Sequence, residues 1–256
     1  MDRPQYTGKQ LQDALNSFYG GSDNASNCKH IFGYNNPNHE LSMLQKITAT
    51  TILDYNTKLS SSTTTVPSIE QLLQTAKEFH NTNGSILQLQ HIIQSKSPSM
   101  ALAAEFKRAS PSKGDIAPNL NAGDQATTYY EAGACVISVL TEERWFKGSL
   151  SDLQNARLKT TAAAAAAANN SNGKEIRPAI LRKDFITSTY QIAEAAAYGA
   201  DTILLIVATT PSNILKELIT YARSIGMEPL VEVHALIELD VAIECVMKLV
   251  LVLLVY

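Results

Sequence analysis

Short apolar runs alternate with helical patterns of hydrophobic residues from Ala101 to the end of the chain. Nearly continuous apolar strands are typical of a parallel sheet that is covered on both faces. Repeated strand–helix units therefore predict an α/β fold, either a doubly wound sheet or a closed barrel. The apolar runs expected to be strands are LAAEF (102–106), CVISVLT (135–141), AILRKDF (179–185), TILLIVA (202–208), PLVEV (229–233) and KLVLVLLVY (248–256).

Helical spacing predicts a helix in each interval between these strands. Three of the helices end in a glycine (Gly133, Gly199 or Gly226), the residue that most readily takes the left-handed cap conformation. The alanine-rich segment TAAAAAAANNSNGKE (161–175) indicates a low-complexity insertion. Its alanines are expected to extend the preceding helix, because alanine has the best helix propensity. The predicted helices are DQATTYYEAG (124–133), LSDLQNARLK (150–159), STYQIAEAAAYGA (188–200), PSNILKELITYARSIG (211–226) and ALIELDVAIE (235–244).

The first hundred residues have a different character. Residues 1–40 are rich in Asn, Gly and Ser, so we expect a poorly ordered lead-in with a short helix at KQLQDALNSFY (9–19). Helical patterns follow at 41–58 and 67–78, and the linker SSSTTT lies between them. The expected domain therefore covers residues 41–256, with extra helices ahead of the strand–helix units.

Composition excludes several classes of protein. The chain has 256 residues and a net charge of -3 without a block of like charge, which argues against a nucleic-acid-binding surface. Its longest apolar run, VMKLVLVLLVY (246–256), is too short for a membrane span, which needs roughly 20 residues. The start lacks the apolar core of a secretory signal. Three widely spaced cysteines without a zinc motif fit a reducing, cytoplasmic environment better than a disulfide framework.

Charged residues stand at the ends of the predicted strands. Glu105 and Lys107 close the first strand, Lys183 closes the third, and Glu232 lies in the fifth. Alternate residues of a barrel strand face the interior, so Glu105 and Lys107 share a face. The C-terminal strand ends of such barrels form the active site, so the two lysines and two glutamates are expected to converge on one partly buried mouth. Burial generally lowers the pKa of a lysine and raises that of a glutamate, which suits both for proton transfer near neutral pH. The alternative of ordinary strand-end ion pairs stays open.

Other positions carry weaker signals. His234 follows the fifth strand and is expected to be a turn residue, while Arg108 and Lys113 are expected to be solvated charges. Trp145 and Phe146 lie in the loop after the second strand. That loop either folds over the core or forms an apolar wall for an aromatic substrate.

Five motifs carry a resemblance to a known family. They are AEFKRASPSKG (104–114), ISVLTEERWFKGSLSDL (137–153), ILRKDFI (180–186), GADTILLIVA (199–208) and EPLVEVH (228–234). With these motifs in this order, the chain from about residue 41 to residue 245 resembles indole-3-glycerol phosphate synthase, a (βα)8 TIM-barrel enzyme of tryptophan biosynthesis. The alanine insertion and the polar lead-in look like those of a fungal form. In fungi this unit is commonly fused to glutamine amidotransferase and phosphoribosylanthranilate isomerase units.

The resemblance implies an activity, a substrate and roles for named residues. The reaction is ring closure of 1-(2-carboxyphenylamino)-1-deoxyribulose 5-phosphate with loss of carbon dioxide and water, without a metal or an organic cofactor. Lys183 matches the general acid that protonates the carbonyl, and Lys107 matches the cation beside the departing carboxylate. Glu105 matches the residue that orients the lysines, and Glu232 matches the one that helps remove the ring proton. The remaining matches are Ser110 for the phosphate and Phe146, Phe185 and Leu204 for the apolar walls around the anthranilate ring.

An alternative chemistry on the same barrel is that of a Schiff-base aldolase. Lys183 would then form an imine with a carbonyl substrate. Trapping of a substrate adduct by borohydride would support that alternative.

The resemblance breaks after Cys245. There the family continues with Gly-Ala-Lys and a strand ending in Gly-Ile-Asn-x-Arg, whereas this chain has Leu253 and Val255 at the polar positions. The last two strand–helix units are absent, so we expect an incomplete barrel of about six strands with two unpaired edges and an aggregation-prone last strand. Such a chain is expected to be poorly stable and inactive. A frameshift, a mis-spliced intron or an incomplete gene model would explain the change. The alternative is a natural truncation that keeps a binding role or has no activity of its own.

Overall fold

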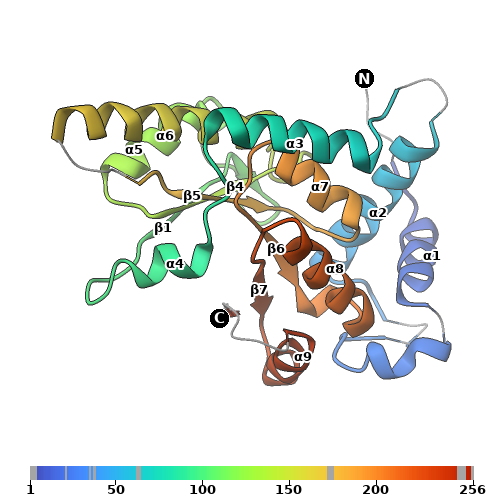
Figure 1. Cartoon of the computed structure of the whole chain (residues 1–256). Helices are drawn as coiled ribbons and strands as arrows, with labels where there is room; N and C mark the ends of the chain where they lie inside the picture. The colour runs from blue at the N-terminus through green and yellow to red at the C-terminus, as the bar shows by residue number, and fades with distance from the viewer. Residues whose placement is uncertain are drawn as a thin grey trace.

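A parallel sheet of six strands forms the centre of the molecule (Figure 1). The computed structural model describes residues 5–20, 22–34, 36, 39–61, 65–171, 176–246 and 252–254. Each strand lies inside one of the predicted apolar runs, and the sheet order follows the chain, as in consecutive units of a (βα)8 barrel. The predicted α/β barrel-type fold is therefore confirmed, with β1 and β8 at the two ends of the described sheet. The strands, in sheet order, are β1 (Ala103–Phe106), β4 (Val136–Leu140), β5 (Ala179–Lys183), β6 (Thr202–Ile206), β7 (Leu230–Val233) and β8 (Val252–Leu254).

Helices follow the strands and cover one face of the sheet. Their boundaries agree with the predicted helices to within a few residues, and α6 continues through the alanine-rich segment as expected. The three glycines predicted to cap helices have φ of 94°, 84° and 87°, which is the left-handed region. The helices are α5 (Ala122–Glu131), α6 (Leu150–Ser171), α7 (Thr189–Ala197), α8 (Ser212–Ser224) and α9 (Leu236–Val246), with the 3-10 turn η2 (Val207–Thr209) after β6.

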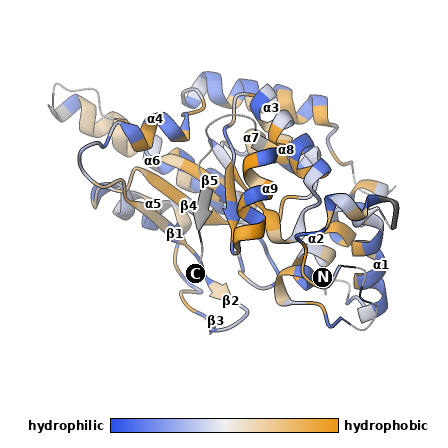
Figure 2. Ribbon diagram, turned by 90° about the horizontal axis from the view of Figure 1, so that it is seen from below, coloured by the Kyte–Doolittle hydropathy of each residue, from blue (hydrophilic) through white to orange (hydrophobic). Residues whose placement is uncertain are grey.

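The sheet separates two hydrophobic cores. Between the sheet and its helices lies an outer core that includes Phe106, Ile180 and Val231. On the other face lies an inner core that includes Leu181, Leu204 and Leu230. Successive residues of one strand therefore point into different cores, as the two-residue period of a strand requires. In Figure 2 the strands at the centre of the molecule are drawn largely in the hydrophobic colour.

In the described residues, four α-helices and the 3-10 helix η1 precede the sheet, and the short strands β2 and β3 interrupt the first strand–helix unit. Helices α1, α2 and α3 each begin with a capping box, formed by Thr7, Ser42 and Ser68 with a glutamine three residues later. The short helix α4 and the hairpin of β2 and β3 were not predicted. The elements are α1 (Gly8–Tyr19), η1 (Ser22–Asn27), α2 (Met43–Ser60), α3 (Ile69–Asn83), α4 (Leu89–Gln94), β2 (Ala109–Ser110) and β3 (Gly114–Asp115).

The described part of residues 1–40 contains helix α1 and the 3-10 helix η1, while the expectation of a poorly ordered lead-in over this range stays a prediction. Helix α1 packs on α2, and the two enclose a small core that includes Leu15, Tyr19, Cys28 and Ile31. Several apolar residues of this segment are buried together in that core, whereas Phe32 is exposed. The division of the chain at residue 40 stays a prediction.

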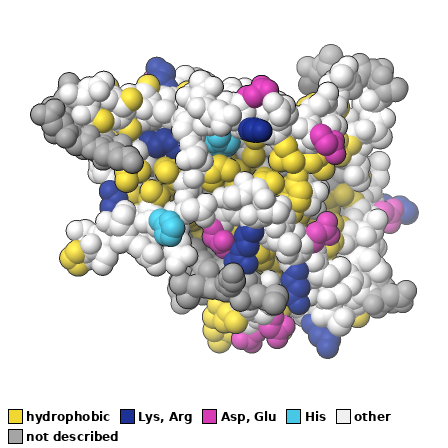
Figure 3. Space-filling model, in the orientation of Figure 1, with side chains coloured by type: hydrophobic (Ala, Val, Ile, Leu, Met, Phe, Trp, Pro, Cys, Tyr) yellow, Lys and Arg dark blue, Asp and Glu magenta, His cyan; other side chains and the backbone are white. Residues whose placement is uncertain are grey.

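The apolar run at the C-terminus lies partly outside the described residues. Within it, β8 pairs with β7 in parallel, with Val252 aligned to Val231. No helix among the described residues has the length and apolar character needed to cross a membrane. Helix α9 exposes Leu236, Ile237 and Ile243, and Figure 3 shows hydrophobic and acidic side chains together at this lower edge.

Candidate active site

Lys183 and Glu232 form an ion pair at the C-terminal end of the sheet. The Lys183 Nζ lies 3.1 Å from the Glu232 Oε2, and the two residues come from β5 and β7 on either side of β6. Only 6% of the Glu232 side chain and 25% of the Lys183 side chain are exposed. The pair therefore sits at the rim of the inner core, where a partly desolvated ammonium and carboxylate face the same space.

Glu105 and Lys107 form a second ion pair, at the end of β1. The Lys107 Nζ lies 2.9 Å from the Glu105 Oε1, and about a third of each side chain is exposed. The strand register aligns Phe106 with Val139, and Leu140 with Lys183. Lys107 is the next residue after Phe106, so it stands at the same level of the sheet as Lys183. The structure thus brings the four residues to one end of the sheet, in two pairs of one lysine and one glutamate.

Aromatic side chains line the inner core beside these pairs. The rings of Phe146 and Phe185 have centroids 6.4 Å apart, and Leu204 is buried in the same cluster. Trp145 also packs against this cluster. The loop after β4 therefore packs on the inner core, and its role as an apolar wall for a substrate stays a prediction.

A buried carboxylate holds that loop in place. Glu142 accepts hydrogen bonds from the backbone N–H groups of Arg144, Trp145 and Phe146, at 2.9, 2.8 and 3.2 Å. Burial raises the pKa of Glu142, although these three donors act in the opposite direction. Glu142 thus fixes the loop geometry that directs Phe146 inward. Its position in the sequence did not indicate this role.

Ser110 lies in the hairpin after β1 and is half-buried. Its hydroxyl oxygen accepts the backbone N–H of Lys113 at 3.2 Å, and Lys113 itself is exposed as predicted.

The prediction of a solvated Arg108 was wrong. Arg108 makes a bidentate pair with Asp152 at 2.5 and 2.7 Å, and it lies 4.9 Å from the ring centroid of Phe106. Its partner is 44 residues away in the chain, so the local run of charges could not reveal it.

His234 lies in the bend after β7, as predicted for a turn residue. Its Nε2 lies 3.5 Å from the Glu232 Oε1, and its backbone N–H donates to Glu238 at 2.7 Å. The imidazole therefore contacts the carboxylate that Lys183 also contacts. Within the described ranges, no group of three or more His, Cys, Asp or Glu side chains is arranged to hold a metal ion.

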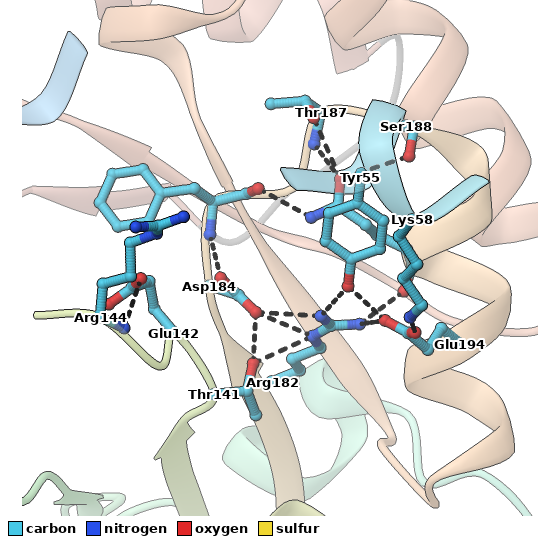
Figure 4. A network of polar contacts seen from close by, with 12 residues as sticks. Tyr55, Lys58, Thr141, Glu142, Arg144, Arg182, Asp184, Thr187, Ser188 and Glu194 are labelled. Carbon is cyan, nitrogen blue, oxygen red and sulfur yellow. Dashed lines mark hydrogen bonds and ion pairs between the residues drawn. The ribbon is translucent and has the colours of Figure 1, made fainter. Parts of the chain in front are cut away.

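A buried network on the opposite face of β5 was missed by sequence reasoning (Figure 4). Arg182 is 1% exposed, and its guanidinium donates to Asp184 at 2.9 Å, to Glu194 at 3.1 Å and to the hydroxyl of Tyr55 at 3.0 Å. Lys58 of α2 lies 2.6 Å from Glu194. The network ties α2 and α7 to the strand that carries Lys183. The strand period contained the signal, because Arg182 stands between two inward-facing residues and must face the helices.

The network also fixes the residues on either side of Lys183. Asp184 accepts the N–H of Phe185 at 2.8 Å, and Gln191 donates to the Phe185 carbonyl at 3.0 Å. The hydroxyl of Thr141, just after β4, donates to Asp184 at 2.5 Å. A cavity of about 390 Å³ opens beside the network, between α2 and the loop after β4, on the side away from Lys183.

Comparisons with known proteins show which sequences this chain is similar to. The sequence model of the family described as indole-3-glycerol phosphate synthase matches residues 50–252. A multifunctional tryptophan biosynthesis protein of Phanerodontia chrysosporium is 56% identical over 144 residues, which are 56% of this chain and 17% of that protein. A protein of the same name from Schizosaccharomyces pombe is 54% identical over 144 residues, 56% of this chain and 18% of that protein. An indole-3-glycerol phosphate synthase of Aquifex aeolicus is 38% identical over 182 residues, 71% of this chain and 61% of that protein. The match thus spans less than a fifth of the two fungal relatives.

Proposed function

Because the chain belongs to the indole-3-glycerol phosphate synthase family, we propose that it closes the indole ring of 1-(2-carboxyphenylamino)-1-deoxyribulose 5-phosphate. Carbon dioxide and water leave in this reaction. The observation that carries the proposal is the Lys183–Glu232 ion pair at the C-terminal ends of β5 and β7. Barrel enzymes build their active sites at this end of the sheet.

In the proposed mechanism, Lys183 is the general acid. The ring carbon attacks the substrate carbonyl, and the carbonyl oxygen needs a proton as the new bond forms. Contact with Glu232 at 3.1 Å suits an ammonium group, the form of lysine that has a proton to give. Glu232 acts at the end of the reaction: once carbon dioxide has left and the hydroxyl departs as water, it accepts the proton that the new ring gives up, because its carboxylate stands at the same rim.

Lys107 and Glu105 serve the loss of carbon dioxide and water. An ammonium at Lys107 attracts the substrate carboxylate until it departs, and it later protonates the leaving hydroxyl. Glu105 orients that ammonium through their contact at 2.9 Å. Electrons released by decarboxylation restore the ring, so no oxidant is required.

The proposed substrate contacts surround these two pairs. The rings of Phe146 and Phe185, with Leu204, offer an apolar wall to the anthranilate ring. Ser110, in the hairpin directly after β1, contacts the phosphate. These assignments rest on the match of each residue to the family's motifs and on the common location of the wall and the lysines.

The test is turnover by the purified chain, followed by the fluorescence of the indole product. We expect Lys183→Ala to abolish turnover while substrate binding stays measurable, because the acid is lost and the apolar wall remains. Glu232→Gln is expected to slow turnover strongly. Lys113→Ala is the matched control, since Lys113 is exposed and lies outside the two pairs. Unchanged turnover in Lys183→Ala would contradict the acid assignment, and an inactive wild-type chain would contradict the function and favour the alternative of a chain without activity of its own.

We propose that the whole protein carries other enzyme activities in addition to this unit. Multifunctional fungal relatives, of which the match covers less than a fifth, support a fusion with glutamine amidotransferase and phosphoribosylanthranilate isomerase units. Three free, buried cysteines support a reducing, cytoplasmic location.

A further inference from the structure

Residues 5–20 and 22–34, here called the N-terminal segment, precede the part of the chain that matches the family. In Figure 1 this segment lies beside α2, at the end of the molecule where α8 begins. We propose that the N-terminal segment clamps the loop after β6, and that His30 is the positioning residue of this clamp. The loop in question is η2 with Thr210.

His30 makes the central contact. Its side chain is 6% exposed, and its Nε2 lies 3.1 Å from the Val207 carbonyl oxygen and 3.0 Å from the Thr210 carbonyl oxygen. Both partners accept hydrogen bonds, so the Nε2 must carry the hydrogen and donate to both. The Thr210 N–H also donates to the Val207 carbonyl at 3.2 Å, which closes the turn. One imidazole thus bridges both ends of the turn from a distance of 177 residues in the chain.

Two further contacts fasten the segment. Ser212 Oγ, at the start of α8, donates to the Asn27 side-chain oxygen at 2.9 Å. At the other end of the segment, the Tyr6 hydroxyl donates to Asp54 at 2.8 Å. Arg144 of the loop after β4 donates to the same carboxylate at 2.7 Å and lies 5.4 Å from the centroid of the Tyr6 ring. The segment therefore reaches the loops after both β4 and β6.

The clamped turn touches the wall of the inner core. Ala208 packs against the cluster that contains Phe185, Leu204 and Ile206. Fixing the carbonyls on either side of Ala208 fixes the position of that part of the wall. The catalytic consequence rests on the proposed function: a loosened turn weakens the grip on the aromatic substrate, while Lys183 and Glu232 keep their places on the sheet.

The experiment compares amide hydrogen exchange and steady-state kinetics in the full chain. In His30→Leu we expect exchange of the peptide covering 207–212 to rise by about tenfold or more, because the donor to both carbonyls is gone. His30→Gln keeps a side-chain N–H donor and is expected to restore part of the protection. Ser212→Ala, which leaves the segment itself intact, is expected to give a smaller rise in the same peptide. His91→Leu is the matched control, because His91 is exposed on α4.

Kinetics supply a second readout. We expect KM to rise about three- to tenfold in His30→Leu with kcat nearly unchanged, the pattern of weakened substrate binding. Exchange at 207–212 that is unchanged in both His30→Leu and Ser212→Ala would overturn the clamp. A rise in exchange with unchanged KM would overturn its link to the substrate wall. If the wild-type chain has no synthase activity, the proposed function fails, while the exchange measurements still decide the clamp.

Discussion

Arg182 offers the sharpest test of how this fold is held together. Its guanidinium is buried between two carboxylates, Asp184 and Glu194, and it also contacts the hydroxyls of Tyr55 and Thr141. Arg182→Met removes the charge and the donors but keeps an unbranched side chain of similar reach. The substitution therefore leaves two buried acids without their shared partner.

The expected loss of stability depends on the partners that Glu194 and Asp184 keep after Arg182 is replaced. Removing one partner of a buried ion pair destabilises a protein by about 3 to 5 kcal/mol. Here Glu194 keeps Lys58 at 2.6 Å, and Asp184 keeps the N–H of Phe185 at 2.8 Å. These remaining partners favour the lower end, about 3 kcal/mol, which is a large share of a domain stability of about 5 to 15 kcal/mol. With a urea m value of about 2 to 3 kcal/mol/M, the unfolding midpoint should fall by about 1 to 1.5 M.

The assay is urea unfolding followed by the fluorescence of Trp145, the single tryptophan of the chain. Lys9→Met is the control, because the paired side chains of Lys9 and Asp13 are 84% and 59% exposed. An exposed pair of this kind contributes little to stability. A double-mutant cycle of Arg182→Met with Glu194→Gln should give a coupling of about 1 kcal/mol or more. The reasoning is refuted if Arg182→Met loses no more stability than Lys9→Met.

Two further predictions concern pH and backbone packing. Burial opposes ionisation of Glu194, but Arg182 and Lys58 outweigh it and lower the pKa of Glu194. A lowered carboxyl pKa stabilises the fold above the unfolded value of about 4.3 and loses that contribution as pH falls through the folded value. Urea midpoints from about pH 6 to about pH 3 should therefore fall less steeply in Glu194→Gln, and equal slopes would count against this. Gly148→Ala would place a Cβ 2.0 Å from the Leu140 carbonyl oxygen, and we expect thermal unfolding to show a loss of about 1 to 3 kcal/mol. Gly8→Ala, with open space around it, is the control; an equal Tm in both variants would contradict the clash.

The strands and long helices were predictable because their signals are local. Each strand of the parallel sheet lies in a largely apolar run, and the capping boxes of α1, α2 and α3 mark where those helices begin. The short elements were not predictable, because tertiary contacts stabilise them. Helix α4 has six residues and packs Leu89 and Ile92 into the inner core. An isolated helix of this length is unstable in water.

The site was predictable in part. The two-residue period placed Glu105 and Lys107 on one face, and the structure pairs them at 2.9 Å. Sequence alone could not choose the partner of Lys183, since Glu232 is 49 residues away. For the same reason, sequence alone could not predict the carboxylate partner of Arg108. That partner depends on how the segments after β1 and β4 meet. Long-range pairing is decided by packing, which a local pattern of charges does not encode.

Four consecutive residues of strand β5 combine a buried charge that holds the fold together with a partly exposed charge at the proposed site. Ile180 and Arg182 face the helices, whereas Leu181 and Lys183 face the inner core. Charge on the helix side is fully paired and buried, so its role is to hold α2 and α7 against the strand. Charge on the inner side stays partly exposed at the open end of the core, where the proposed substrate would approach. Substitution at Arg182 should therefore act through stability, and substitution at Lys183 through turnover, even though the two residues are neighbours. A strand that ends in consecutive charged residues can be divided into a face that packs on helices and a face that points to the open end of the core, once the sheet direction is known.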